Sequence, residues 1–288
     1  MATSARSAPA RAPPVQQPVA LCHGYMGFGK LAFMPYFHPK LVALVEAASP
    51  YPVTRPVVSP LEGIAVRAGQ LADALRAARA EMGDESLRFN VVAHSMAGLD
   101  VRYLIAHLGG DELVASLTTL GTPHRGSAVA DVLAGSLEAS ATIERIVSWL
   151  GISTDGLRDL TTAATAAFNA AVPNSPRVLY FSVASYDDPS PMHPYAVTSR
   201  MLRAAAPSDP RSTTGRTGSR VVATPGSSAP RDHFDSDGLV TVASAKWGKL
   251  IGIFPEVNHT DLMGFPRLRP KVVDIYKAVL ANLERHGL

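Results

Sequence analysis

The chain has 288 residues, of which 47% are hydrophobic and 18% charged, with a formal net charge of +3. This composition can bury one large core or two modest ones. The basic excess is diffuse and forms no stripe with interleaved aromatic residues, which argues against nucleic-acid binding. The single cysteine, Cys22, excludes an internal disulfide, so nothing in the chain demands an oxidising compartment. No apolar stretch reaches membrane-spanning length.

The first 18 residues differ in composition from the rest of the chain. Residues 1–18 are rich in Ala, Arg, Ser and Pro, contain no acidic residue and lack the apolar stretch of a secretory signal. We expect a disordered tail here, with a mitochondrial targeting segment as the alternative. An intracellular protein, in the cytosol or the mitochondrion, is therefore favoured over a secreted one. Residues 19–288 are predicted to form a single domain.

From residue 18 onward, short apolar runs alternate with stretches of helical periodicity. In chain order, the pattern predicts a strand at 18–23, a helix at 41–48, a strand at 51–58, a helix at 64–82, a strand at 89–93, a helix at 97–107, strands at 114–120 and 177–183 with a helix at 157–171 between them, a strand at 250–254 and a helix at 271–285. This alternation predicts the α/β class, with a mostly parallel central sheet and helices on both faces.

Two segments break the alternation. Residues 128–152 are apolar on one face. Residues 207–230 are rich in Ser, Thr, Gly, Pro and Arg and are predicted to form a long flexible loop. Neither segment indicates a separate domain.

The most informative stretch is 91–98, Val-Val-Ala-His-Ser-Met-Ala-Gly, which joins a predicted strand to a predicted helix. A serine flanked by small residues at such a junction is typical of a strained elbow that exposes a nucleophilic hydroxyl. The usual pattern is Gly-x-Ser-x-Gly, whereas this chain has Ala93 and Ala97, with Gly98 one place later. We predict that Ser95 is the nucleophile. The alternative is an ordinary buried strand that ends in a polar turn.

An acyl-transfer serine needs a base and an acid, which in strand–elbow–helix enzymes follow it in the order acid, then histidine. Asp237, in Asp-Ser-Asp-Gly-Leu-Val-Thr-Val, and His259, in Val-Asn-His-Thr-Asp, fit this order. Asp232 and Asp235 compete for the role of the acid. A turn-forming Asp-Gly pair and a surface histidine are the alternatives for Asp237 and His259.

The same chemistry needs N–H donors for the oxyanion of the tetrahedral intermediate. We predict the backbone N–H of Met96, which follows the nucleophile, and that of Tyr25, in the glycine-flanked turn after the first strand. The loop Gly-Thr-Pro-His-Arg-Gly-Ser, residues 121–127, follows a later strand and is expected to border the same cleft.

Five segments together resemble the true lipases of the α/β-hydrolase superfamily, both the bacterial family I triacylglycerol lipases and the class 2 lipases of fungi. They are Leu-Cys-His-Gly-Tyr-Met-Gly-Phe, Ala-His-Ser-Met-Ala-Gly-Leu-Asp-Val-Arg-Tyr, Thr-Thr-Leu-Gly-Thr-Pro-His-Arg-Gly-Ser, Ser-Asp-Gly-Leu-Val and Val-Asn-His-Thr-Asp. The resemblance extends from residue 21 to about residue 265. It implies the α/β-hydrolase fold, and the same nucleophile, acid, base and oxyanion donors that chain order indicates.

The resemblance also implies a lid and a metal. In the family, the segment after the Thr-Pro-His-Arg-Gly-Ser block carries an amphipathic lid, and residues 128–152 have the required character. The predicted substrate-contacting residues there are Val132, Leu133, Trp149 and Leu150, while a permanently packed helix pair is the alternative.

Bacterial members of the family bind a structural Ca²⁺ through two aspartates, and Asp261 matches one of them. We find no match to the other in the Ser/Thr/Arg-rich loop, so we predict no cofactor and leave open a structural Ca²⁺ near Asp261.

The expected function is therefore that of a serine hydrolase, which cleaves acylglycerols or other long-chain fatty-acid esters at a lipid–water interface. A phospholipid deacylase or an acyltransferase on the same triad is one alternative. A non-catalytic protein of the same fold that binds a lipid or a partner is another. The sequence does not indicate an oligomeric state.

Overall fold

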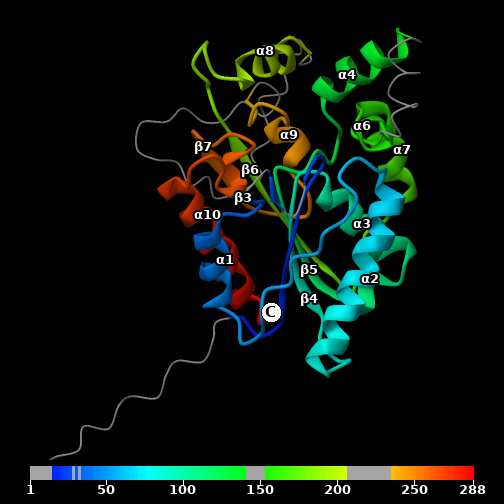
Figure 1. Cartoon of the computed structure of the whole chain (residues 1–288), viewed down its shortest axis with the longest axis vertical. Coiled ribbons are helices and arrows are strands. Elements are labelled where there is room, and N and C mark those ends of the chain that lie inside the picture. Colours follow the sequence, from blue (N-terminus) through cyan, green and yellow to red (C-terminus); the bar gives the residue numbers. More distant parts are fainter. Residues whose placement is uncertain (1–14, 28–29, 32–33, 141–152, 206–234) are drawn as a thin grey trace, which may run out of the picture.

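A computed structural model describes residues 15–27, 30–31, 34–140, 153–205 and 235–288 (Figure 1). At the centre is a five-stranded parallel sheet in the order β1 (Val19–Cys22), β4 (Phe89–His94), β5 (Val114–Leu120), β6 (Leu179–Tyr186) and β7 (Lys249–Pro255). A two-residue antiparallel pair, β2 (Lys30–Leu31) and β3 (Met34–Pro35), follows β1. The predicted parallel sheet is confirmed.

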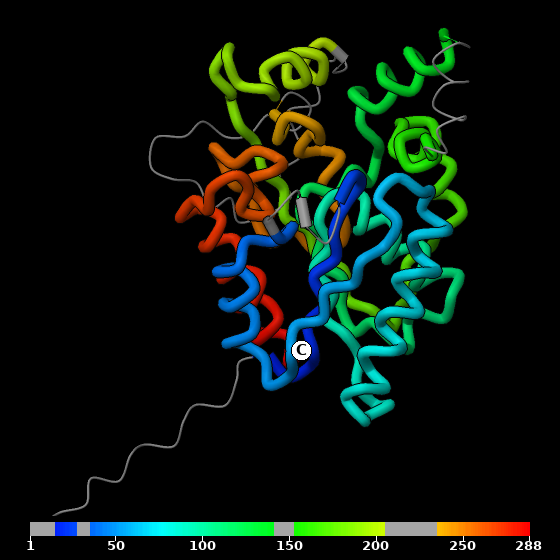
Figure 2. Tube along the Cα trace, in the orientation of Figure 1, coloured from blue at the N-terminus to red at the C-terminus, as the bar shows by residue number. Residues whose placement is uncertain are grey.

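Helices cover both faces of this sheet. Figure 2 shows α1 (Pro39–Glu46), in blue, beside α10 (Pro270–Arg285), in red, on one side, with α2 (Ile64–Met82) and α3 (Ala97–His107) on the other. Successive side chains of β4 point to opposite faces of the sheet, so both faces need helices to cover them. Val92 packs with α1 and α10, whereas Val91 and Ala93 pack with α2 and α3. β4 thus packs apolar side chains against helices on both faces, as is typical of strands in parallel sheets.

The remaining helices lie in connections between strands. They are η1 (Gly110–Glu112), α4 (Ala128–Glu138), α6 (Asp155–Asp159), α7 (Thr162–Ala171), α8 (Tyr195–Ala205), α9 (Val242–Ala245) and η3 (Asp261–Met263). In Figure 1, α4, α6, α8 and α9 gather at the upper end of the molecule, beyond the sheet. Of the helices in the part of the chain that the structure describes, none combines the length and apolarity needed to cross a membrane.

The structure corrects two of the predicted elements. Residues 51–58 are not a strand, since only Thr54 forms a bridge, to Ala20, and the prolines at 52 and 56 have no N–H to donate. The helix predicted at 157–171 is divided into α6 and α7. Thr161 divides it because its backbone is extended (ψ 156°) and its hydroxyl caps α7 by accepting from the Ala164 N–H. The structure also contains α8 and the short β2–β3 pair, which the sequence pattern did not predict.

The prediction of a disordered tail is wrong for its last four residues, 15–18. Val15 is fully buried, and its N–H donates to the Ala48 carbonyl. The Gln16 N–H donates to the carbonyl of the last residue, Leu288, so both ends of the described chain meet. Residues 1–14, the loop 207–230 and residues 141–152 of the predicted lid lie outside the described residues; the described part of that lid is α4.

Candidate active site

The elbow between β4 and α3 places Ser95 in the left-handed region, with φ 57°. Few non-glycine residues adopt this conformation, and neighbouring bonds must hold it. The Ser95 N–H donates to the Leu120 carbonyl at 3.0 Å, and the Ser95 carbonyl accepts from the Thr122 hydroxyl at 2.7 Å. β5 and the loop after it therefore fix the strained residue from both sides.

The small residues around Ser95 have different roles. A Cβ on Gly98 would lie 2.7 Å from Cγ2 of Thr122 and 2.8 Å from Cγ2 of Thr119, so that position requires glycine. Ala93 and Ala97 are buried, and the elbow forms with their methyl groups in place. The departure from the usual glycine pattern thus leaves the turn intact.

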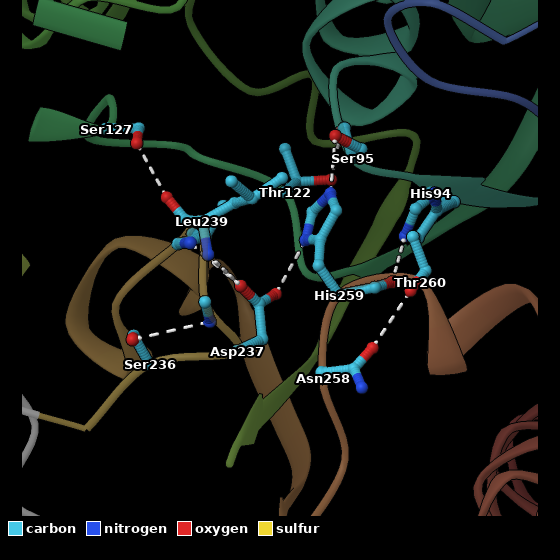
Figure 3. A network of polar contacts seen from close by, with 12 residues as sticks. His94, Ser95, Thr122, Ser127, Ser236, Asp237, Leu239, Asn258, His259 and Thr260 are labelled. Carbon is cyan, nitrogen blue, oxygen red and sulfur yellow. Dashed lines mark hydrogen bonds and ion pairs between the residues drawn. The ribbon is translucent and has the colours of Figure 1, made fainter. Parts of the chain in front are cut away.

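Three side chains that are far apart in the sequence meet at the elbow (Figure 3). His259 Nε2 lies 2.9 Å from Ser95 Oγ, and His259 Nδ1 lies 2.7 Å from Asp237 Oδ2. Because a carboxylate oxygen accepts, Nδ1 carries the proton and donates to Asp237. Nε2 is then free to accept from the Ser95 hydroxyl. This is the arrangement that turns a serine into a nucleophile.

The acid, Asp237, belongs to a tight turn at residues 235–240. Asp237 Oδ1 accepts from the N–H groups of Leu239 at 3.0 Å and Val240 at 2.8 Å, which leaves Oδ2 for the histidine. The Asp237 carbonyl also accepts from the His259 N–H at 2.8 Å, so backbone and side chain both join the two residues. The structure thus brings Asp237 to the base; Asp232 lies outside the described residues.

Gly121 is a site residue to which the sequence analysis gave no role of its own. Its φ is 58°, and a Cβ there would lie 2.9 Å from Asp237 Oδ2 and 3.3 Å from His259 Nδ1. Any side chain at this position would press on the hydrogen bond between the acid and the base. The signal was present in the sequence, because Gly121 directly precedes the Thr-Pro-His-Arg-Gly-Ser block.

One predicted oxyanion donor, Met96, directly follows the nucleophile, and the other, Tyr25, follows Gly24, whose backbone lies close to Ser95. Neither the Tyr25 N–H nor the Met96 N–H has an acceptor among the residues that the structure describes. Gly24 makes the approach possible, since a Cβ there would lie only 2.6 Å from Ser95 Cβ. Two unused N–H groups beside a nucleophile are what an oxyanion requires.

A buried ion pair holds the turn that contains Tyr25. The Arg67 guanidinium donates to the His23 carbonyl at 2.9 Å, to the Ser59 carbonyl at 2.6 Å and to Asp100 Oδ2 at 2.9 Å. Burial raises the pKa of Asp100 to about 6, against the opposing effect of Arg67. Arg67 therefore joins the end of β1 to α3, which begins beside the nucleophile.

The predicted substrate-contacting residues are only partly described. Val132 and Leu133 lie on α4 and are each 50% exposed, while Trp149 and Leu150 lie outside the described residues. α4 packs with α6, α7 and α8. The structure therefore leaves two large apolar side chains exposed on the described half of the predicted lid.

The surroundings of Asp261 do not fit a calcium ion. Asp261 Oδ2 already bonds to Arg269 Nη1 at 2.8 Å and accepts from the Asn258 N–H at 3.0 Å. A guanidinium beside the carboxylate would repel a second cation. In the described part of the chain, no group of three or more His, Cys, Asp or Glu side chains could hold a metal ion.

Curated proteins that are similar to this chain in sequence are named triacylglycerol lipases. Triacylglycerol lipase 2 of Saccharomyces cerevisiae is 31% identical over 186 residues, which are 64% of this chain and 48% of the yeast protein. A triacylglycerol lipase of Vibrio cholerae serotype O1 is 33% identical over 149 residues, 52% of this chain and 46% of that protein. The chain thus spans about half the length of these curated relatives. The predicted resemblance to triacylglycerol lipases is confirmed, although no family model matches the chain.

Solved structures show the same fold. The mature lipase BlEst2 of Bacillus licheniformis superimposes with a TM-score of 0.66 and 19% identity over 96% of both chains. The lipase of Staphylococcus hyicus gives a TM-score of 0.64 and 16% identity over 97% of this chain and 98% of that one. These similarities confirm the predicted α/β-hydrolase fold.

The contact between Arg269 and Asp261 leads to a prediction about stability. Replacing Arg269 by Gln is expected to lower the free energy of unfolding by about 1 kcal/mol, because Asp261 is buried and Arg269 is one-third exposed. Lys277→Gln, in an exposed pair with Asp274, is the matched control and should change the free energy of unfolding little.

The same surroundings predict that calcium does not stabilise the protein. In thermal unfolding, the midpoint of the unmodified protein is expected to be equal with EDTA and with added calcium. A higher midpoint with calcium would contradict this reading of the site.

Proposed function

We propose that this protein is a serine hydrolase that cleaves acylglycerols or other long-chain fatty-acid esters through an acyl-enzyme. The observation that carries the proposal is the 2.9 Å contact of His259 Nε2 with Ser95 Oγ, with Asp237 behind the histidine. Sequence similarity to proteins named triacylglycerol lipase supports an ester of a fatty acid as the substrate.

In the proposed mechanism, Ser95 Oγ attacks the ester carbonyl carbon while His259 Nε2 takes the hydroxyl proton. The N–H groups of Tyr25 and Met96 donate to the oxyanion of the tetrahedral intermediate. In sites of this kind, each such donor stabilises the transition state by about 3–4 kcal/mol. Asp237 stabilises the imidazolium, which then protonates the departing alcohol.

Water completes the cycle by the same steps. His259 takes a proton from the water, which attacks the acyl-enzyme carbonyl, and the tetrahedral intermediate collapses with return of the proton to Ser95 Oγ. The products are a carboxylic acid and the regenerated serine.

We infer that the apolar face of residues 128–152 contacts the acyl chain or a lipid surface, as a lid over the site. Support comes from Val132 and Leu133, which α4 leaves half exposed. We also propose that residues 19–288 act as one catalytic domain.

The nucleophile assignment predicts a large loss of activity in Ser95→Ala. Removal of the hydroxyl should lower the hydrolysis rate of a chromogenic acyl ester by about four to six orders of magnitude, because no acyl-enzyme can form. Ser86→Ala, at an exposed serine in a turn, is the control and should retain full activity. Equal hydrolysis by Ser95→Ala and the unmodified protein would exclude the proposed function.

The acid assignment predicts different outcomes at two neighbouring aspartates. Asp237→Asn should reduce kcat about 10⁴-fold, because an amide facing Nδ1 favours the tautomer that cannot accept the serine proton. Asp235→Asn makes the same change two residues away and should keep most of the activity. A larger loss of kcat in Asp235→Asn than in Asp237→Asn would assign the role of the acid to Asp235.

The substrate class predicts a dependence on the physical state of the ester. Hydrolysis of long-chain esters should rise steeply once the substrate forms an emulsion, because an apolar lid face gains contacts at a lipid surface. A preference for soluble short esters would instead make the protein an esterase. Product analysis with added alcohol or phospholipid distinguishes the acyltransferase and the phospholipid deacylase on the same triad.

A further inference from the structure

A buried chain of hydrogen bonds behind the catalytic residues takes no part in the proposed chemistry. The Gly24 N–H donates to the Tyr36 hydroxyl at 3.1 Å, and that hydroxyl lies 2.7 Å from His94 Nδ1. On the other side of the ring, His94 Nε2 lies 3.0 Å from the His259 carbonyl oxygen. Both Tyr36 and His94 are buried. The chain therefore runs from the oxyanion turn to the backbone of the base.

The two ends of this chain determine the direction of every bond in it. A backbone N–H can only donate and a carbonyl can only accept. His94 must therefore donate from Nε2 to the His259 carbonyl, which leaves Nδ1 as an acceptor in the neutral ring. Tyr36 then donates to Nδ1 and accepts from Gly24. Each of these polar groups is satisfied in one arrangement only.

This arrangement requires a neutral His94. The titratable groups that face its ring are Tyr36, His259 and His23. Burial lowers the pKa of His94 well below its usual value, and the neighbouring His259, whose ring centroid is 4.7 Å away, lowers it further. Burial also lowers the pKa of His23 to about 4, so it too is neutral at neutral pH. A proton on His94 Nδ1 would reverse the bond to Tyr36 and leave the tyrosine proton without its acceptor.

The chain joins three parts of the site that come from different segments. Gly24 immediately precedes Tyr25 and lies so close to Ser95 that a Cβ on it would clash. His94 immediately precedes Ser95, and the bonded carbonyl belongs to His259 itself. Displacement of any of these parts moves the oxyanion donor relative to the nucleophile and the base. Such displacements of about 1 Å reduce catalysis by about 100-fold.

We propose that Tyr36 and His94 are positioning residues, which set the oxyanion turn at Gly24–Tyr25 against the Ser95–His259 pair through this one-directional chain. The inference rests on the proposed function of Ser95. It assigns to Tyr36 and His94 a role in aligning the site, separate from attack on the substrate.

The test compares two buried tyrosines. Tyr36→Phe removes the central hydroxyl of the chain and should lower kcat by about 10- to 100-fold, with KM changed by about twofold or less. Tyr276→Phe is the matched control, since its buried hydroxyl donates one hydrogen bond, to the Leu262 carbonyl, outside this chain. The control should lose some stability but keep its kcat. Equal effects of the two substitutions on kcat would overturn the proposal.

The pH profile separates alignment from a general loss of stability. In Tyr36→Phe, Nδ1 of His94 loses its donor, so the pKa of His94 rises and the ring takes up a proton more easily. A charged His94 opposes the positive charge that His259 gains during the reaction. The acid limb of kcat/KM should therefore move to higher pH in Tyr36→Phe and stay in place in Tyr276→Phe. An unmoved limb in Tyr36→Phe would contradict the mechanism.

A measurement on the unmodified protein does not depend on the folding of any variant. The ring ¹⁵N shifts of His94 should report the neutral Nε2–H tautomer throughout the active pH range. The Nδ1–H tautomer, or a charged ring within that range, would overturn the inference. If Ser95→Ala abolishes hydrolysis but Tyr36→Phe matches the control, this inference alone fails. If Ser95→Ala stays active, the proposed function itself fails.

Discussion

The hydrogen bond between His259 Nε2 and Ser95 Oγ joins residues 164 positions apart, and the rest of the site serves to keep this contact in place. This bond can activate the serine hydroxyl only if the imidazole presents a lone pair to it. Asp237 ensures this by accepting from Nδ1, and its own turn fixes the other carboxylate oxygen with two backbone N–H groups. Backbone donors lose no side-chain entropy, so the acid is oriented before any substrate arrives.

The parallel sheet explains why these residues can meet. Because its strands run in one direction, the loops after β4, β5 and β7 leave the same edge, where Ser95, Gly121 and His259 lie. The segment between β6 and β7 supplies the acid in the same region. Close packing requires glycine at three positions of this region. A methyl group on Gly24 would meet Ser95, one on Gly98 would meet Thr122, and one on Gly121 would meet Asp237. The elbow tolerates Ala93 and Ala97 because the close contacts fall on Gly98 instead.

Hydrogen bonds join the buried polar groups behind the site. Arg67 bonds to two carbonyls and to Asp100, and the chain through Tyr36 and His94 satisfies a donor at one end and an acceptor at the other. Such groups are costly to bury unless they are bonded, and once bonded they allow few alternative arrangements. Their effect is to make the oxyanion turn, the elbow and the base loop parts of one rigid unit. Asp261, near which the family resemblance suggested a calcium ion, is bonded to the Arg269 guanidinium.

The sequence alone determined the order of the five main strands and of α1, α2, α3 and α10, and the three residues of the candidate triad. Local signals sufficed for this, because α2, α3 and β5 have strong periodicity and the elbow has a distinctive run of small residues. The same signals failed at 51–58, where prolines prevent pairing, and at 157–171, where the Thr161 cap divides the helix. Only the tertiary structure decided that Gly121 must lack a side chain, that Asp261 pairs with Arg269, and that Tyr36 and His94 connect the oxyanion turn to the base. Each of these depends on distances between residues remote in the chain, and no local pattern of residue types encodes such distances.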